Sequence, residues 1–112
     1  MTFEDIATML ESTGLPVAYN AFRVGNVPEL PYIVYSFPNS DNFGADNKTY
    51  KNIESLRVWL CTKQKDFFAE YNFESVLNAN DLFWNKTESF EQNDAMYMIL
   101  YEMEILINAE QS

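Results

Sequence analysis

A strict alternation of large apolar residues near the C-terminus constrains the fold of this chain more than any other feature of its sequence. A period of two is that of a β-strand with one buried face, whereas an amphipathic helix has a period near 3.6. We therefore predict a long strand over Ala95–Ile107. The residues on its apolar face are Tyr97, Ile99, Tyr101, Met103, Ile105 and Ile107.

The opposite face of the same strand changes character along its length. Met98 and Leu100 are followed by Glu102 and Glu104, and then by Leu106. Two carboxylates that point the same way could serve acid–base chemistry or hold a divalent ion. A solvated acidic face is the simpler interpretation in a chain this acidic, and we predict such a face at Glu102 and Glu104.

The remaining pattern predicts two helices and further strands within a single domain of residues 1–112. Thr2 and Asp5 form a variant of the capping box, and Gly14 ends the helix that follows; Asp66 can begin a second helix. Tight connections favour antiparallel neighbours. We predict an α+β fold in which a small antiparallel sheet is flanked by two helices, in the order α-β-β-β-α-β-β. The predicted strands are Leu15–Tyr19, Tyr32–Phe37, Tyr50–Cys61, Phe83–Phe90 and Ala95–Ile107, and the helices lie between Thr2 and Gly14 and between Asp66 and Leu77.

The segment Asn39–Lys48 is rich in residues that favour turns, and we predict a fairly long loop there. Its one aromatic residue, Phe43, stands between Asn42 and Gly44. Such a side chain can fold back onto the domain or project as an anchor into a partner. The sequence leaves these two alternatives open.

The charge of the chain limits the kinds of partner that it can bind. Seventeen acidic and seven basic residues, with no histidine, give a formal charge of −10. This balance disfavours binding to a nucleic-acid backbone or to an anionic membrane. Residues 66–112 hold ten acids and a single base, Lys86, so one face should be strongly negative.

The residues for common catalytic and metal-binding sites are missing from the sequence. Without histidine and with Cys61 as the single cysteine, the ordinary zinc sites and the histidine-dependent nucleophile arrangements cannot be assembled in one chain. Three glycines, none in a phosphate-binding motif, argue against nucleotide chemistry. We predict no catalytic, cofactor-binding or metal-binding residue, a protein that is not an enzyme, and an inert Cys61 in a reducing cytoplasm.

Several segments carry a resemblance to a known family: residues 14–22, 28–35 and 40–47, Tyr50, residues 60–62, 65–67 and 84–86, and the closing segment 96–102. They resemble the small tail proteins of long-tailed bacteriophages that infect Gram-positive bacteria, often labelled minor capsid proteins, and together they look like a tail terminator. The resemblance covers nearly the whole chain, although none of its motifs is a catalytic signature.

The resemblance implies a homohexameric ring that sits on the finished tail tube, stops further addition of tube subunits and offers a surface to the head–tail connector. Its partners would be further copies of itself, the tail tube protein and the connector protein, with no cofactor and no membrane. It would lie in the virion, at the head-proximal end of the tail, after assembly in the host cytoplasm. DNA would pass through the ring without specific binding, and Glu102 and Glu104 could line that lumen. The implied contact with the tube is the loop Asp41, Asn42, Phe43, Gly44, Ala45 and Asp46.

Other functions remain open on the sequence. A neighbouring connector protein, for tail completion or head closure, has similar size and acidity. From another class, an acidic inhibitor that mimics DNA would suit a charge of −10. A small enzyme built on a carboxylate pair is a third alternative, although nothing in the sequence specifies two carboxyl groups facing a cleft.

Overall fold

The computed structural model describes residues 1–45 and 48–108, which form two helices and five strands. This is the predicted α+β class in the predicted order of elements. The helices are α1 (Phe3–Glu11) and α2 (Phe67–Ala79), and the strands are β1 (Val17–Tyr19), β2 (Tyr32–Ala45), β3 (Lys48–Thr62), β4 (Asn85–Glu91) and β5 (Met96–Asn108).

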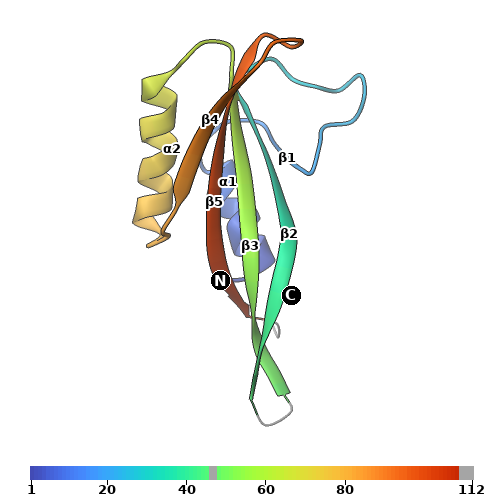
Figure 1. Ribbon diagram of the computed structural model, residues 1–112, viewed down its shortest axis with the longest axis vertical. Coiled ribbons are helices and arrows are strands. Elements are labelled where there is room, and N and C mark those ends of the chain that lie inside the picture. The colour runs from blue at the N-terminus through green and yellow to red at the C-terminus, as the bar shows by residue number, and fades with distance from the viewer. Residues whose placement is uncertain (46–47, 109–112) are drawn as a thin grey trace.

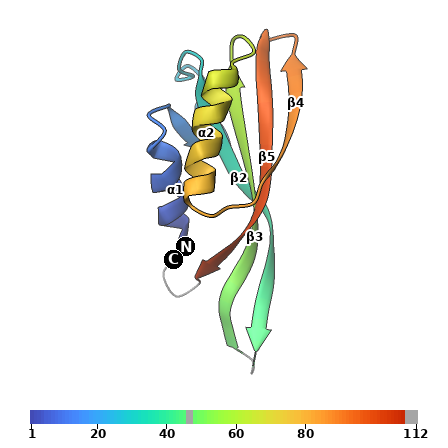
Figure 2. The ribbon, with the colours of Figure 1, turned by 90° about the vertical axis from the view of Figure 1, so that its left-hand side faces the viewer.

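The strands form one sheet in the order β1-β2-β3-β5-β4. The short β1 pairs in parallel with β2, and every other pair is antiparallel. Both helices lie on the same side of the sheet, which Figure 2 shows edge-on. The fold therefore has two layers, and the other side of the sheet, which we call the open face, carries no helix in the described part of the chain.

The strand predicted near the C-terminus exists as β5, and its apolar face was predicted correctly. Ile99, Tyr101, Met103, Ile105 and Ile107 are all buried beneath the helical layer. Residues next to one another in β5 point to opposite sides of the sheet, so Leu100, Glu102, Glu104 and Leu106 lie on the open face.

Both helices begin where side-chain caps predict. The Thr2 hydroxyl accepts a hydrogen bond from the Asp5 amide at 3.0 Å, and the Asp5 carboxylate accepts one from the Thr2 amide at 2.9 Å. Together they satisfy amides that the first turn of α1 leaves without partners. At the start of α2 the Asp66 carboxylate accepts from the Ala69 amide at 2.9 Å.

The prediction of a loop over Asn39–Lys48 was wrong. β2 continues to Ala45 and β3 begins at Lys48, with paired residues from Asn39↔Ser55 to Ala45↔Lys48. A register shift between Ser36 and Asn39 accommodates Pro38, so the proline does not end the strand. The paired segments 39–45 and 48–55, here called the hairpin arm, reach beyond the helices at one end of the molecule (Figure 1).

The predicted strand Phe83–Phe90 also needs correction at its start, because β4 runs from Asn85 to Glu91. Trp84 instead packs on the helical side. Its ring centroid lies 5.5 Å from that of Tyr101, and its indole donates to the Asn78 side chain at 3.0 Å. Trp84 thus joins the end of α2 to the core before the strand begins.

Candidate interaction surfaces

The open face of the sheet exposes apolar side chains at its centre. Val34 and Trp59 are paired residues of β2 and β3, and Trp59 is in turn paired with Leu100 of β5. All three are partly exposed, and Leu106 near the end of β5 is half exposed. A sheet face that keeps a tryptophan and several aliphatic residues accessible is suited to contact with another protein.

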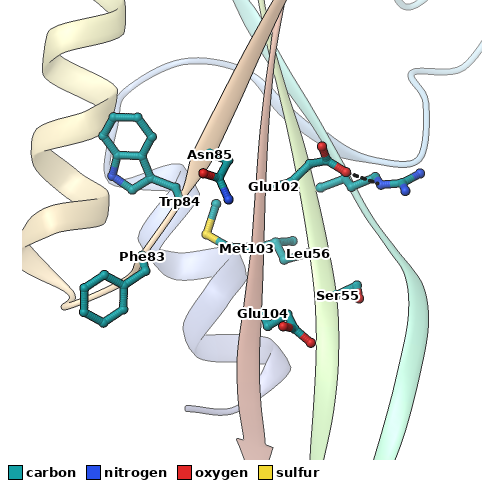
Figure 3. A pocket seen from close by; sticks show the side chains of 9 residues that line it. Ser55, Leu56, Phe83, Trp84, Asn85, Glu102, Met103 and Glu104 are labelled. Atoms are coloured by element: carbon teal, nitrogen blue, oxygen red, sulfur yellow. Dashed lines mark hydrogen bonds and ion pairs between the residues drawn. The ribbon is translucent and has the colours of Figure 1, made fainter.

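The predicted acidic pair lies on this open face, but its two members have different surroundings. Glu102 forms an ion pair with Arg57 of β3, with Nε and Oε2 3.2 Å apart and with 42% and 44% of the two side chains exposed. The dashed line in Figure 3 marks this pair. Glu104 is exposed. The free negative charge at this position therefore belongs mainly to Glu104.

A shallow cavity of about 680 Å³ lies beside the acidic pair (Figure 3). Ser55 and Asn85 give it polar walls, and Phe83 and Trp84 give it aromatic ones. No group of three or more histidine, cysteine, aspartate or glutamate side chains among the described residues is placed to hold a metal ion. The arrangement offers one exposed carboxylate and hydrogen-bonding side chains, which suits contact with a polar surface.

The predicted tube-contact segment falls on the hairpin arm. The backbone of Asp41, Asn42, Phe43, Gly44 and Ala45 forms the last part of β2, whereas Asp46 lies outside the described residues. The segment is thus a strand of a projecting hairpin where a loop was predicted. The predicted tube-contact residues lie on β2, which β3 separates from the acidic pair on β5, so the two sets of predicted residues are not paired with each other, although Ser55 at the base of the hairpin arm is paired with Glu104.

A cluster of charged groups between α2 and β4 was not predicted from the sequence. The side chain of Glu70 is only 4% exposed, and its carboxylate forms ion pairs with Lys65 at 2.6 Å and with Lys86 at 3.0 Å. Lys86 also contacts Glu74 at 2.7 Å, and Lys65 also pairs with Glu88 of β4. We call these five residues the charge cluster. The cluster ties the edge strand β4 to the helix.

The charge cluster reaches the core through a tyrosine. The Tyr101 hydroxyl donates to the Glu74 carboxylate at 2.7 Å, and burial together with this negative neighbour raises the pKa of Tyr101. Burial also acts to raise the pKa of Glu70, but hydrogen bonds and positive charge from Lys65 and Lys86 outweigh it and hold that pKa below its ordinary value. Glu70 is therefore ionised at neutral pH.

The pH dependence of stability should report on Glu70. Its carboxylate has a lower pKa in the folded chain than in the unfolded chain, where glutamate titrates at roughly 4.3. Its stabilising contribution is therefore complete above that pH and is lost as the pH falls through the folded value. We expect the free energy of unfolding, measured with urea between pH 7 and pH 3, to fall less steeply in Glu70→Gln than in the unchanged chain. Parallel curves for the two proteins would contradict this role.

Cys61 is a buried thiol on the open-face side of β3, where it faces the segment that joins β1 to β2. Burial raises its pKa to about 11. The thiolate is the reactive form, so we expect the folded chain at pH 8 to react with iodoacetamide far more slowly than the urea-unfolded chain. Mass spectrometry of timed samples measures both rates. Equal rates would show that Cys61 is accessible.

No helix in the described part of the chain is both long and apolar enough to cross a membrane. Comparison with family models and with curated proteins finds no match to this chain. The function of the chain must therefore be inferred from its surfaces and from the resemblance of its sequence segments.

Proposed function

We propose that this chain is a structural protein of a bacteriophage virion, a tail terminator that caps the tail tube as a ring, stops its polymerisation and provides the surface for head joining. The observation that carries the proposal is the two-layer fold, which covers one side of the sheet and leaves Val34, Trp59 and Leu100 accessible on the other. A ring subunit needs apolar surface of this kind to contact its neighbours.

The hairpin arm supports the same proposal. Its strands reach beyond the helical layer at one end of the long axis of the molecule (Figure 1). In our proposal the segment 41–46 touches the tail tube, and the projecting strands carry that contact away from the body of the ring. Glu104, exposed on the open face, is the better of the two predicted acids for a surface that repels passing DNA, because Arg57 offsets the charge of Glu102.

The arrangement of the acids favours this proposal over a DNA mimic. Such an inhibitor has to present its carboxylates free, in place of phosphates. Here several acids of the second half of the chain are engaged by cations within the molecule. They are Glu70, Glu74, Glu88 and Glu102.

Deletion of the gene from the phage that encodes the chain tests the proposed function directly. We expect electron microscopy of the lysate to show tails of uncontrolled length, restored to one length when the chain is supplied from a plasmid. Tails of normal length without heads would instead assign the chain to tail completion or head closure. Normal, infectious particles would refute a structural role in the virion.

A further inference from the structure

Three aromatic side chains stand exposed on the first turns of α2. Phe67 and Phe68 are each 75% exposed and Tyr71 is 69% exposed. Residues four apart in a helix lie on the same side, so Phe67 and Tyr71 are neighbours and Phe68 flanks them. Single exposed apolar residues are ordinary, but three large rings on one helix surface mark a site of association. We call these three residues the aromatic knob.

The open face holds an apolar groove that could receive such a knob. It has a volume of about 380 Å³ and lies between the sheet and the segment that joins β1 to β2. Methionine and aromatic side chains suit it to an aromatic guest, because they are polarisable and methionine adapts its shape. Its apolar lining consists mainly of Phe22, Val27, Tyr32, Val34, Trp59 and Met98.

The aromatic knob and the groove cannot meet within one molecule. α2 covers the side of the sheet on which Leu60 and Ile99 are buried. Trp59 and Met98 are the neighbours of these residues along the strands, and side chains alternate between the two sides, so the groove opens on the other side. Both features therefore face outward, in different directions.

Their placement along the molecule is matched. α2 begins at the same end of the long axis as the turn between β4 and β5, and the segment joining β1 to β2 lies near that end on the opposite flank (Figure 1). Two neighbouring copies with parallel long axes would thus hold the aromatic knob of one at the height of the groove of the other.

The charges beside the two features are complementary. Lys63 is exposed just before α2, whereas Lys65, whose ammonium lies 4.7 Å from the ring centroid of Phe67, is already paired with Glu70 and Glu88. Beside the groove, the exposed Asp94 stands two residues before Met96, which lines the groove and accepts a hydrogen bond from the Tyr32 hydroxyl at 3.7 Å. Attraction between Lys63 beside the knob of one copy and Asp94 beside the groove of the next would favour this contact in a chain whose copies otherwise repel each other.

We infer that the aromatic knob of one copy inserts into the groove of the next copy. The contact joins two different surfaces, so each added copy leaves one knob and one groove free, and the series closes when the rotation between neighbours completes a circle. The inference rests on the proposed ring, and it names the surfaces that build that ring.

Cysteine cross-linking between differently tagged copies tests the contact. One protein carries Phe68→Cys and the other carries Val27→Cys, both at exposed positions where the fold tolerates the change. We expect the mixed disulfide to exceed both homodimers on a non-reducing gel, in a concentrated solution of the isolated chain. The matched control pairs Phe83→Cys with Val27→Cys, because Phe83 is also exposed but lies outside the knob and the groove. This pair should give no excess.

Sedimentation velocity provides a second measurement. Losing one aromatic hot spot weakens an interface about 30-fold or more, so Phe68→Ser should raise the dissociation constant of self-association on that scale, while Phe83→Ser should leave it unchanged.

Homodimers of Phe68→Cys in excess, or no mixed disulfide at all, would overturn the inference, and so would a chain that stays monomeric. Overlong tails after gene deletion would still uphold the proposed function in that case. Conversely, a mixed disulfide with normal tails would uphold the contact and refute the function.

Discussion

Alanine in place of Phe73 is expected to lower the free energy of unfolding by about 3–5 kcal/mol, the range for truncating a buried aromatic residue. Phe73 lies on the buried face of α2 and is 1% exposed. Its ring meets that of Tyr101 at a centroid distance of 4.8 Å in an edge-to-face arrangement. Truncation would remove this contact and leave a cavity between α2 and β5, where the helical layer meets the sheet.

Urea denaturation followed by circular dichroism measures the effect, with Phe83→Ala as the matched control. The same substitution there removes a ring that is 93% exposed, and we expect a change within about 0.5 kcal/mol. Similar losses for Phe73→Ala and Phe83→Ala would contradict the packing described for α2. A change in the slope of the denaturation curve would report altered compactness of the unfolded chain.

Methionine in place of Lys86 is expected to cost about 1–3 kcal/mol, because it keeps most of the apolar stem but leaves the buried carboxylate of Glu70 and the partly buried one of Glu74 with less positive charge. Of the ion pairs and hydrogen bonds in the described part of the chain, Glu70 would keep the one with Lys65 and Glu74 the one with the Tyr101 hydroxyl. The pKa of Glu70 should rise as a result, so the loss of stability should shrink at acidic pH, where the carboxylates are protonated.

Arg57→Met is the matched control for Lys86→Met, since it breaks the ion pair with Glu102 on the open face. Both partners of that pair are substantially exposed, and such pairs contribute about 0–1 kcal/mol. Thermal and urea unfolding at pH 7 compare the two variants. Equal costs would show that the charge cluster contributes no more than an ordinary surface pair.

The sequence was most informative where one physical preference dominated. The alternation along β5 identified both its strand structure and its buried face, because a one-residue slip would bury Glu102 and Glu104 in place of Tyr101 and Met103. The capping pair of Thr2 and Asp5 located the start of α1 in the same way, through a local contact that needs no information about the rest of the fold.

The sequence was misleading where pairing with another strand overrides local preference. Asn39–Lys48 contains residues that favour turns, yet most of it is held in the ladder between β2 and β3. The predicted strand Tyr32–Phe37 stops before Pro38 because proline cannot donate to the ladder, but the register shift beside Pro38 lets the ladder continue. A strand with so many turn-favouring residues is stabilised by its pairing with the neighbouring strand. The sequence of one segment does not show that pairing.

The charge cluster was missed because it joins α2 to β4, and the sequence does not show that these two elements lie side by side. Lys86 stands out as the only base after Lys65, and this isolation was the available signal that it serves several acids. The pairing of Arg57 with Glu102 required the register of β3 against β5, which places the two side by side. The apolar residues of α2 cover more than one narrow stripe of the helix, and only the position of the sheet shows which side of the helix is free.

The charge cluster also has a consequence for how copies of the chain avoid uncontrolled aggregation. β4 is the last strand of the sheet, and an unprotected edge of seven residues is a template for strands from other molecules. Lys86 and Glu88 point toward the helical side and are held there by α2 and Lys65. A strand from another molecule that paired with β4 would shield these charges from water and would offer them no new partners. The edge is thus guarded against random strand addition, so that copies at high local concentration are left to associate through their side chains.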